Sequence, residues 1–202
     1  MREERLELVR AAKFKPLRSL IHVLVGLGAA ALLALFPRWE ALLVQTLALV
    51  SSLAFELIRL RNPRVNGWFM SKFSALVRPE EERRVGGHVY LLLGALATAL
   101  FFEREIAIAA ILFLAAGDAA GVSAGSKLGL IRLGNGKSVE GALACFASCL
   151  FVGAAYLASF HALSFKAILI GSIAASIAEL LSIPPDDNLS MPILAALVMK
   201  LS

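Results

Sequence analysis

The sequence has few charged side chains and almost no cysteine. Asp, Glu, Lys and Arg make up 17% of its 202 residues, whereas 59% are hydrophobic. Soluble domains contain about 25% charged and about 45–50% apolar residues, so this composition excludes an ordinary soluble domain. It predicts an all-α, polytopic integral membrane protein. The two cysteines, Cys145 and Cys149, lie one helical turn apart in an apolar run, which indicates neither a disulfide framework nor a zinc site.

The basic residues lie between the apolar runs. The formal net charge is +5, but this distribution indicates membrane topology and not nucleic-acid binding. Most of the 20 lysines and arginines fall in the N-terminal tail, in residues 59–84 and in residues 127–137. The positive-inside rule therefore places the N-terminus and these loops in the cytoplasm. Residues 1–18 mix both charge signs, which predicts a retained interfacial segment and not a signal peptide.

Seven apolar segments are predicted to cross the membrane as a bundle within a single domain, residues 1–202. They are residues 20–36, 41–60, 85–102, 105–125, 139–160, 165–183 and 189–201. The last is short, because about 20 apolar residues are needed to span a bilayer squarely. Residues 61–84, between the second and third segments, contain an amphipathic stretch that we expect at the membrane interface.

An acid, Asp118, lies in the middle of the fourth apolar segment. A carboxylate inside a bilayer is costly and marks a functional site by default. Further acids fall on the same predicted side of the membrane: Glu140, Glu179, Asp186 and Asp187. Mg²⁺ takes oxygen ligands and binds through one or two carboxylates together with substrate phosphates. These five acids are therefore the predicted metal ligands; ion pairing or loop solvation is the alternative.

A glycine-rich loop with the sequence GNGKS covers residues 134–138. Its backbone N–H groups, cation and hydroxyl suit a polyphosphate. A P-loop is rejected, because position 131 is isoleucine and a membrane helix precedes the loop. The predicted nucleotide-binding residues are Gly125, Lys127, Gly134, Asn135, Gly136, Lys137, Ser138 and Arg59. The predicted catalytic residues are Asp118, Lys137 and Glu140; a plain inter-helix turn is the alternative for the loop.

Several other polar residues allow either a substrate-binding or a structural role. Glu56 and Arg59, at i and i+3, form either a helix-surface pair or, with Asn62, an anchor for a phosphate. His22 and His88 are expected to form hydrogen bonds either to a lipid headgroup or to other groups of the protein. Asn188, which follows the two aspartates of the last loop, belongs to the same group.

Three motifs occur in order along the chain. They are AGDAAG with later glycines (116–129), GKSVEG (136–141) and, after Glu179, DDNLSMP (186–192). They resemble those of the dolichol kinase, phytol kinase and CTP-dependent diacylglycerol kinase family, over about residues 15–200. The resemblance implies transfer of the γ-phosphate of a nucleoside triphosphate, typically CTP, to a lipid alcohol, with Mg²⁺ or another divalent metal.

Two other functions stay open. A related cytidylyltransferase would release pyrophosphate and form a CDP-lipid. A transporter would use Asp118 and Glu179 as ion or proton sites, which broken helices or inverted repeats would favour. The residues do not distinguish polyprenol or dolichol, phytol and diacylglycerol as the acceptor, nor CTP from ATP as the donor.

Overall fold

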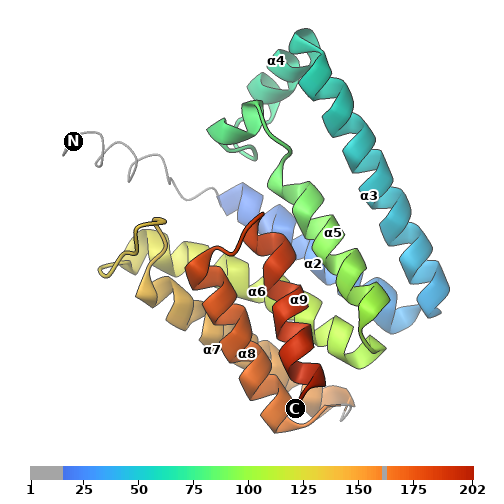
Figure 1. Cartoon of the computed structure of the whole chain (residues 1–202), viewed down its shortest axis with the longest axis vertical. Coiled ribbons are helices and arrows are strands. Elements are labelled where there is room, and N and C mark those ends of the chain that lie inside the picture. The colour runs from blue at the N-terminus through green and yellow to red at the C-terminus, as the bar shows by residue number, and fades with distance from the viewer. Residues whose placement is uncertain (1–15, 161–162) are drawn as a thin grey trace.

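The computed structural model describes residues 16–160 and 163–202. These residues form eight α-helices and one 3-10 turn, with no β-strand among them, so the all-α prediction is confirmed (Figure 1). The elements are α2 (Pro16–Leu35), α3 (Arg38–Arg61), α4 (Pro63–Lys72), η1 (Pro79–Glu82), α5 (Gly87–Phe101), α6 (Arg104–Leu128), α7 (Val139–Phe160), α8 (Phe165–Leu181) and α9 (Asp187–Lys200). The predicted interfacial segment at residues 1–18 falls almost wholly outside the described residues.

Among the described residues, four helices are long and apolar enough to cross a membrane: α2, α3, α6 and α7. The other three predicted spans also form helices, but α5, α8 and α9 have only 15, 17 and 14 residues. About 20 residues are needed for a perpendicular crossing. The structure therefore supports four of the seven predicted spans. Residues 61–84 form α4 and η1, and their place at the interface stays a prediction.

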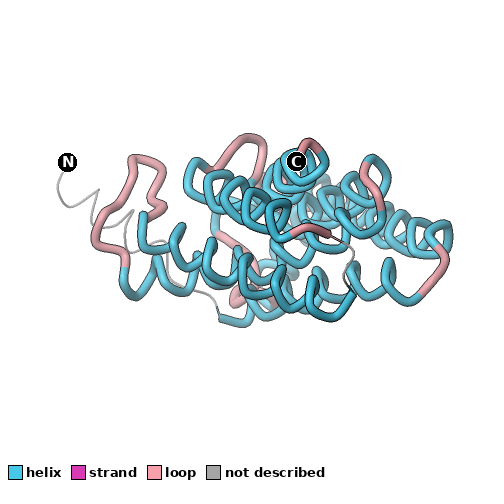
Figure 2. The backbone as a smooth tube through the Cα atoms, turned by 90° about the horizontal axis from the view of Figure 1, so that it is seen from below, coloured by secondary structure: helices cyan, strands magenta, loops and turns pink. Residues whose placement is uncertain are grey.

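Helix α6 is the centre of the bundle. The membrane-spanning window of α6 is 67% buried, against 22–28% for α2, α3 and α7. It lies among α2, α7, α8 and α9, and the helices form a layered, flattened bundle (Figures 1 and 2). Small residues allow this close approach: a Cβ added to Gly117 would lie 2.6 Å from Cys149 Sγ. The two cysteines are free and buried, as packing residues are.

Helix α3 lies at the edge of the bundle (Figure 1). Its apolar side chains, among them Leu43, Leu47 and Val50, are about half exposed. A soluble monomer rarely exposes a large continuous apolar surface, whereas contact with lipid tails accounts for one. The last turns of α3, however, carry the buried residues Glu56 and Arg59, which anchor the loop that precedes α5.

Candidate functional site

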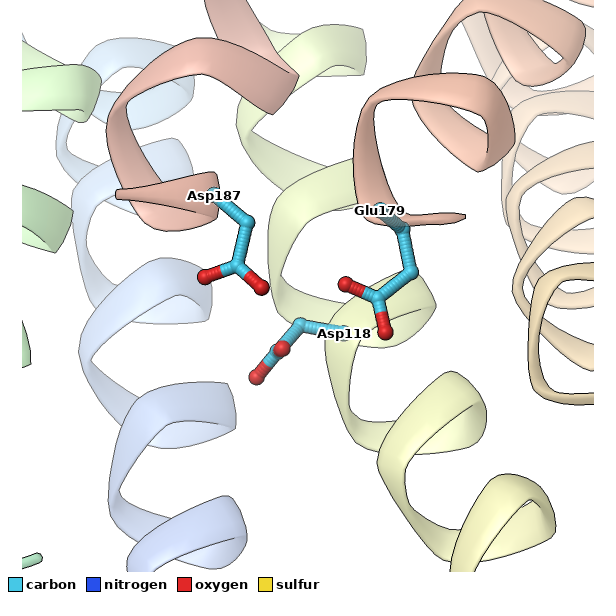
Figure 3. Close-up of side chains that lie close together, drawn as sticks. All are labelled: Asp118, Glu179 and Asp187. Atoms are coloured by element: carbon cyan, nitrogen blue, oxygen red, sulfur yellow. The ribbon is translucent and has the colours of Figure 1, made fainter. Parts of the chain in front are cut away.

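Three carboxylates from three helices converge at one end of the bundle. Asp118 of α6, Glu179 of α8 and Asp187 of α9 each offer an oxygen, and these oxygens lie within 4.8 Å of one another (Figure 3). Their side chains are 13%, 3% and 9% exposed. We call these three residues the acid cluster. Residues far apart in the sequence thus meet in a largely buried position, where unpaired charges are costly.

Lys137 supplies the cation next to the acid cluster. Its Nζ lies 2.6 Å from Glu179 Oε2 and 2.6 Å from Asp187 Oδ2. The loop before α7 folds back as a tight turn, in which Leu133 N donates to the Lys137 carbonyl oxygen at 2.8 Å. The Asn135 side chain ties the loop to the end of α8 by donating to the Leu180 carbonyl oxygen at 2.9 Å. These bonds hold Lys137 over the acids.

The charges of the cluster perturb one another. Burial alone would lower the pKa of Lys137, but the carboxylates of Asp187, Glu179 and Asp118 outweigh it and raise the pKa, so the ammonium is charged at neutral pH. Burial alone would raise the pKa of Asp187, but Lys137 outweighs it and lowers the pKa. Asp187 is therefore ionised at neutral pH. The site combines fixed charges of both signs.

Asp186 caps helix α9 and does not join the acid cluster. Its Oδ1 accepts hydrogen bonds from Asn188 N at 2.9 Å and from Asn188 Nδ2 at 2.7 Å. Burial and the neighbouring Asp187 raise the pKa of Asp186 to about 6. The cap satisfies a free N–H group of the first turn and fixes where α9 begins. It thereby places Asp187 in that first turn, where the helix dipole favours negative charge.

Two further basic groups approach the acid cluster. His22 of α2 has its Nδ1 3.8 Å from Asp118 Oδ2. The second is Arg78, which lies in the loop between α4 and η1. Burial alone would lower the pKa of Arg78, but the carboxylates of Asp187, Asp118 and Asp186 outweigh it and raise the pKa. The sequence did not single out Arg78, because one arginine in a basic loop carries no distinguishing pattern.

The pair of Glu56 and Arg59 lies in a different network. Arg59 is 0% exposed and donates to both Glu56 carboxylate oxygens, at 2.6 and 2.7 Å. It also donates to the carbonyl oxygens of Glu81 and Arg84, both at 2.9 Å. Glu56 Oε2 in turn accepts from Gly86 N at 2.8 Å. The structure thus places Arg59 as a buried brace between α3 and the loop before α5, and its part in nucleotide binding stays a prediction.

Asn62 and His88 flank this brace. The side-chain oxygen of Asn62 caps α4 by accepting from Arg64 N at 3.0 Å. His88 Nε2 lies 3.9 Å from Glu56 Oε1. Neither residue is part of the acid cluster, and their contacts fit the structural alternative.

Glu140 and the glycine-rich loop at residues 134–138 differ from the arrangement that the sequence suggested. The Glu140 carboxylate accepts from Ile131 N at 3.2 Å and lies outside the acid cluster. The N–H groups of Gly136 and Lys137 already donate within the loop, to Leu133 O at 3.0 Å and to Asn135 Oδ1 at 3.1 Å. Two of the N–H groups predicted to bind phosphate are therefore already used within the loop.

The remaining predicted loop residues pack or lie exposed. Ser138 is 4% exposed, and its Oγ accepts from Gly141 N at 3.1 Å. A Cβ added to Gly125 would lie 3.0 Å from the same Oγ, so this glycine serves the crossing of α6 and α7. Gly134 is exposed in the turn, and Lys127 lies in the last turn of α6.

The acid cluster fits a divalent cation of the Mg²⁺ type. It offers three carboxylates, which are the hard oxygen ligands that such ions require. Lys137 is paired with two of them, Glu179 and Asp187, and Asp118 lies beside both. The residues that would hold the ion are Asp118, Glu179 and Asp187.

Comparison with known proteins gives two distant relatives. An uncharacterized protein of Rickettsia prowazekii is 29% identical over 163 residues, covering 78% of this chain and 79% of that protein. CTP-dependent diacylglycerol kinase 1 of Eremothecium gossypii is 28% identical over 173 residues, or 74% of this chain. The chain is distantly similar to a CTP-dependent lipid kinase. The match spans 55% of that kinase's length. No family profile and no solved structure match the chain.

Proposed function

We propose that the protein transfers the γ-phosphate of a nucleoside triphosphate, CTP foremost, to the hydroxyl group of a membrane lipid alcohol. One observation carries the proposal: Lys137 and three carboxylates meet where α8 ends and α9 begins, beside the long apolar helix α6. The distant similarity to a CTP-dependent diacylglycerol kinase supports the same chemistry. By the distribution of basic residues, this end of the bundle faces the cytoplasm, where nucleotides are present.

Each charged residue then has a part in binding the donor. Asp118, Glu179 and Asp187 would hold the divalent cation, which would neutralise charge on the phosphates. Lys137 has three N–H donors. Two of them are directed at Glu179 and Asp187, so the third is left for a phosphate oxygen. Arg78 adds a positive charge on the loop side.

The transfer itself requires little covalent chemistry from the protein. The lipid hydroxyl oxygen attacks the γ-phosphorus, and the bond from that phosphorus to the β,γ-bridging oxygen breaks. The nucleoside diphosphate leaves with the electron pair of this bond, and the hydroxyl proton passes to a carboxylate of the acid cluster. Positioning and charge stabilisation dominate such reactions, and a fixed lysine beside three acids supplies both.

The experiment is a transfer assay with purified protein in liposomes and Mg²⁺. CTP, ATP, GTP and UTP are offered in γ-labelled and α-labelled form against polyprenol, phytol and diacylglycerol, with phosphatidate as a further acceptor. We expect label from γ-labelled CTP in the lipid and none from α-labelled CTP. Lipid that takes up the α-label while pyrophosphate is released would identify a cytidylyltransferase instead. No labelled lipid with any pair would refute both enzymes and leave transport to be tested.

A further inference from the structure

Within the described residues, two buried polar atoms without hydrogen-bond partners belong to side chains that border the same glycine, Gly87. They are Arg18 Nη2 and Asn188 Oδ1. A Cβ added to Gly87 would touch Arg18 Nη2 and lie 3.4 Å from Asn188 Nδ2, so both side chains border the same point. Arg18 lies in the first turn of α2, Gly87 begins α5, and Asn188 lies in the first turn of α9. The side chains that carry the unpaired donor and the unpaired acceptor therefore meet at Gly87, at the starts of three helices.

The arginine is held so that one of its nitrogens stays unpaired. Arg18 Nη1 donates to Glu81 Oε1 and Oε2, at 2.9 and 3.0 Å, and to the Leu76 carbonyl oxygen at 3.1 Å. Glu81 is fixed in turn by Gly87 N at 3.0 Å and Arg78 N at 2.9 Å. All of these bonds use Nη1, which leaves Nη2 rigidly placed without a partner. A buried group left unsatisfied in this way is uncommon and calls for an explanation.

The acceptor is oriented just as firmly. Asn188 is 2% exposed, and its Nδ2 donates to Asp186 Oδ1 at 2.7 Å. Exchanging the amide oxygen and nitrogen would place two oxygens, one of them charged, against each other. The hydrogen-bond network therefore fixes the amide orientation, and the oxygen faces away from Asp186.

A ligand for this pair must accept from a guanidinium and donate to an amide oxygen. A hydroxyl group does both, whereas an ionised phosphate only accepts and a metal ion does neither. We propose that Arg18 Nη2 and Asn188 Oδ1 bind and orient the hydroxyl group of the lipid alcohol. This inference rests on the proposed function, and it assigns the acceptor subsite within it.

The position of the pair suits an acceptor. Asn188 follows Asp187 in the chain, and Arg18 lies one helical turn before His22, whose Nδ1 is 3.8 Å from Asp118 Oδ2. Figure 3 shows α2 and α9 beside Asp118 and Asp187, with Glu179 approaching from α8. The hydroxyl subsite thus borders the acid cluster from α2 and α9, while Lys137 enters from the loop before α7. A lipid bound there keeps its chain in the bilayer and its hydroxyl at the headgroup level.

The test compares each lipid alcohol with an analogue that lacks only the hydroxyl. Binding of diacylglycerol and its 3-deoxy analogue, and of phytol and its deoxy hydrocarbon, is measured on the full chain in detergent. The variants are Arg18→Lys, whose single ammonium keeps the ion pair with Glu81, and Asn188→Leu, which removes the acceptor. Arg83→Lys is the matched control for the arginine-to-lysine change, because Arg83 is exposed in the chain between η1 and α5.

We expect the wild-type protein and Arg83→Lys to bind one alcohol at least about tenfold more tightly than its deoxy analogue, as the loss of a charged hydrogen bond implies. In Arg18→Lys and Asn188→Leu this ratio should fall toward one. In the transfer assay, KM for the alcohol should rise while KM for the nucleotide stays unchanged. A purely structural role would weaken alcohol and analogue equally and would leave the ratio as it is.

Each other outcome overturns the inference. A wild-type protein that binds every alcohol and its deoxy analogue equally has no hydroxyl subsite, whatever the variants do. If the ratio of affinities for the alcohol and its deoxy analogue is unchanged in folded Arg18→Lys or Asn188→Leu, then Arg18 and Asn188 do not form the hydroxyl subsite. If phosphate is transferred while the ratio is unchanged, the inference fails and the proposed function stands. If no phosphate is transferred, the proposed function fails, and the binding ratio still decides whether a hydroxyl group binds here.

Discussion

Replacement of Arg59 by alanine should destabilise the protein and leave its affinity for nucleotide unchanged. Arg59 is completely buried and makes bonds of 2.6–2.9 Å to Glu56, to Asn66 and to two backbone carbonyl oxygens. Alanine removes all of them at once. Because these bonds join α3 to the loop before α5, their loss should loosen that loop.

The magnitude follows from what is left behind. Glu56 is 1% exposed, and in the Arg59→Ala variant its carboxylate would still accept the hydrogen bond from Gly86 N at 2.8 Å. It would have lost both bonds to the guanidinium. Removing one partner of a buried ion pair costs about 3–5 kcal/mol, because the other charge stays buried without compensation. We expect a loss of unfolding free energy in that range. Replacing both residues by methionine should recover part of it, because no buried carboxylate then remains.

The assay is unfolding by SDS in mixed micelles, followed by circular dichroism, together with KM for CTP in the transfer assay. Arg64→Ala, an exposed arginine of α4, is the control and should unfold like the wild-type protein. An Arg59→Ala protein of unchanged stability, with a KM for CTP raised tenfold or more, would refute this reasoning. It would restore Arg59 to the nucleotide site.

Three further predictions concern packing, charge and pH. Gly117→Ala should lower the unfolding free energy of the protein by about 1–3 kcal/mol, because the added Cβ would meet side chains at 2.6 Å. Gly28→Ala is the control and should leave the stability unchanged, because nothing lies within 4 Å of its added Cβ. Unfolding in SDS compares the two variants. Lys137→Met should lower kcat for transfer by about 10²–10³, measured with labelled CTP. Burial opposes a low pKa for Glu81, but the Arg18 guanidinium and backbone N–H groups hold the pKa below its ordinary value. The stability that the Glu81 carboxylate gives the folded protein should therefore be complete above the pKa of about 4.3 in the unfolded chain. It should be lost as the pH falls through the lower pKa of the folded protein. Glu81→Gln should remove this part of the pH dependence of unfolding in acid.

The sequence predicted the helical bundle and the region of the site, because both follow from local patterns. The predicted apolar segments 20–36, 41–60, 105–125 and 139–160 correspond to the four long helices. The topology rule placed Asp118, Glu179 and Asp187 at the same end of the bundle. It did not predict which acids would meet, since that depends on the direction in which each helix presents its side chains.

Lys137 and Glu140 illustrate the difference. They are three positions apart, yet Lys137 faces Glu179 and Asp187, while Glu140 turns back to Ile131 N. The tight turn before α7 decides between them, and no periodic pattern describes it. The role of Arg18 was missed for a similar reason, because its partners lie in irregular chain between α4 and α5.

The acid cluster is tested most directly by one matched pair of variants on α6. Asp118 lies in the cluster, whereas Glu105 is exposed at the opposite end of the same helix. The measurement is the rate at which γ-labelled phosphate appears in the lipid. We predict that Asp118→Asn lowers this rate by about three orders of magnitude and that Glu105→Gln retains it. Full activity in a folded Asp118→Asn protein would contradict the assignment of the active centre.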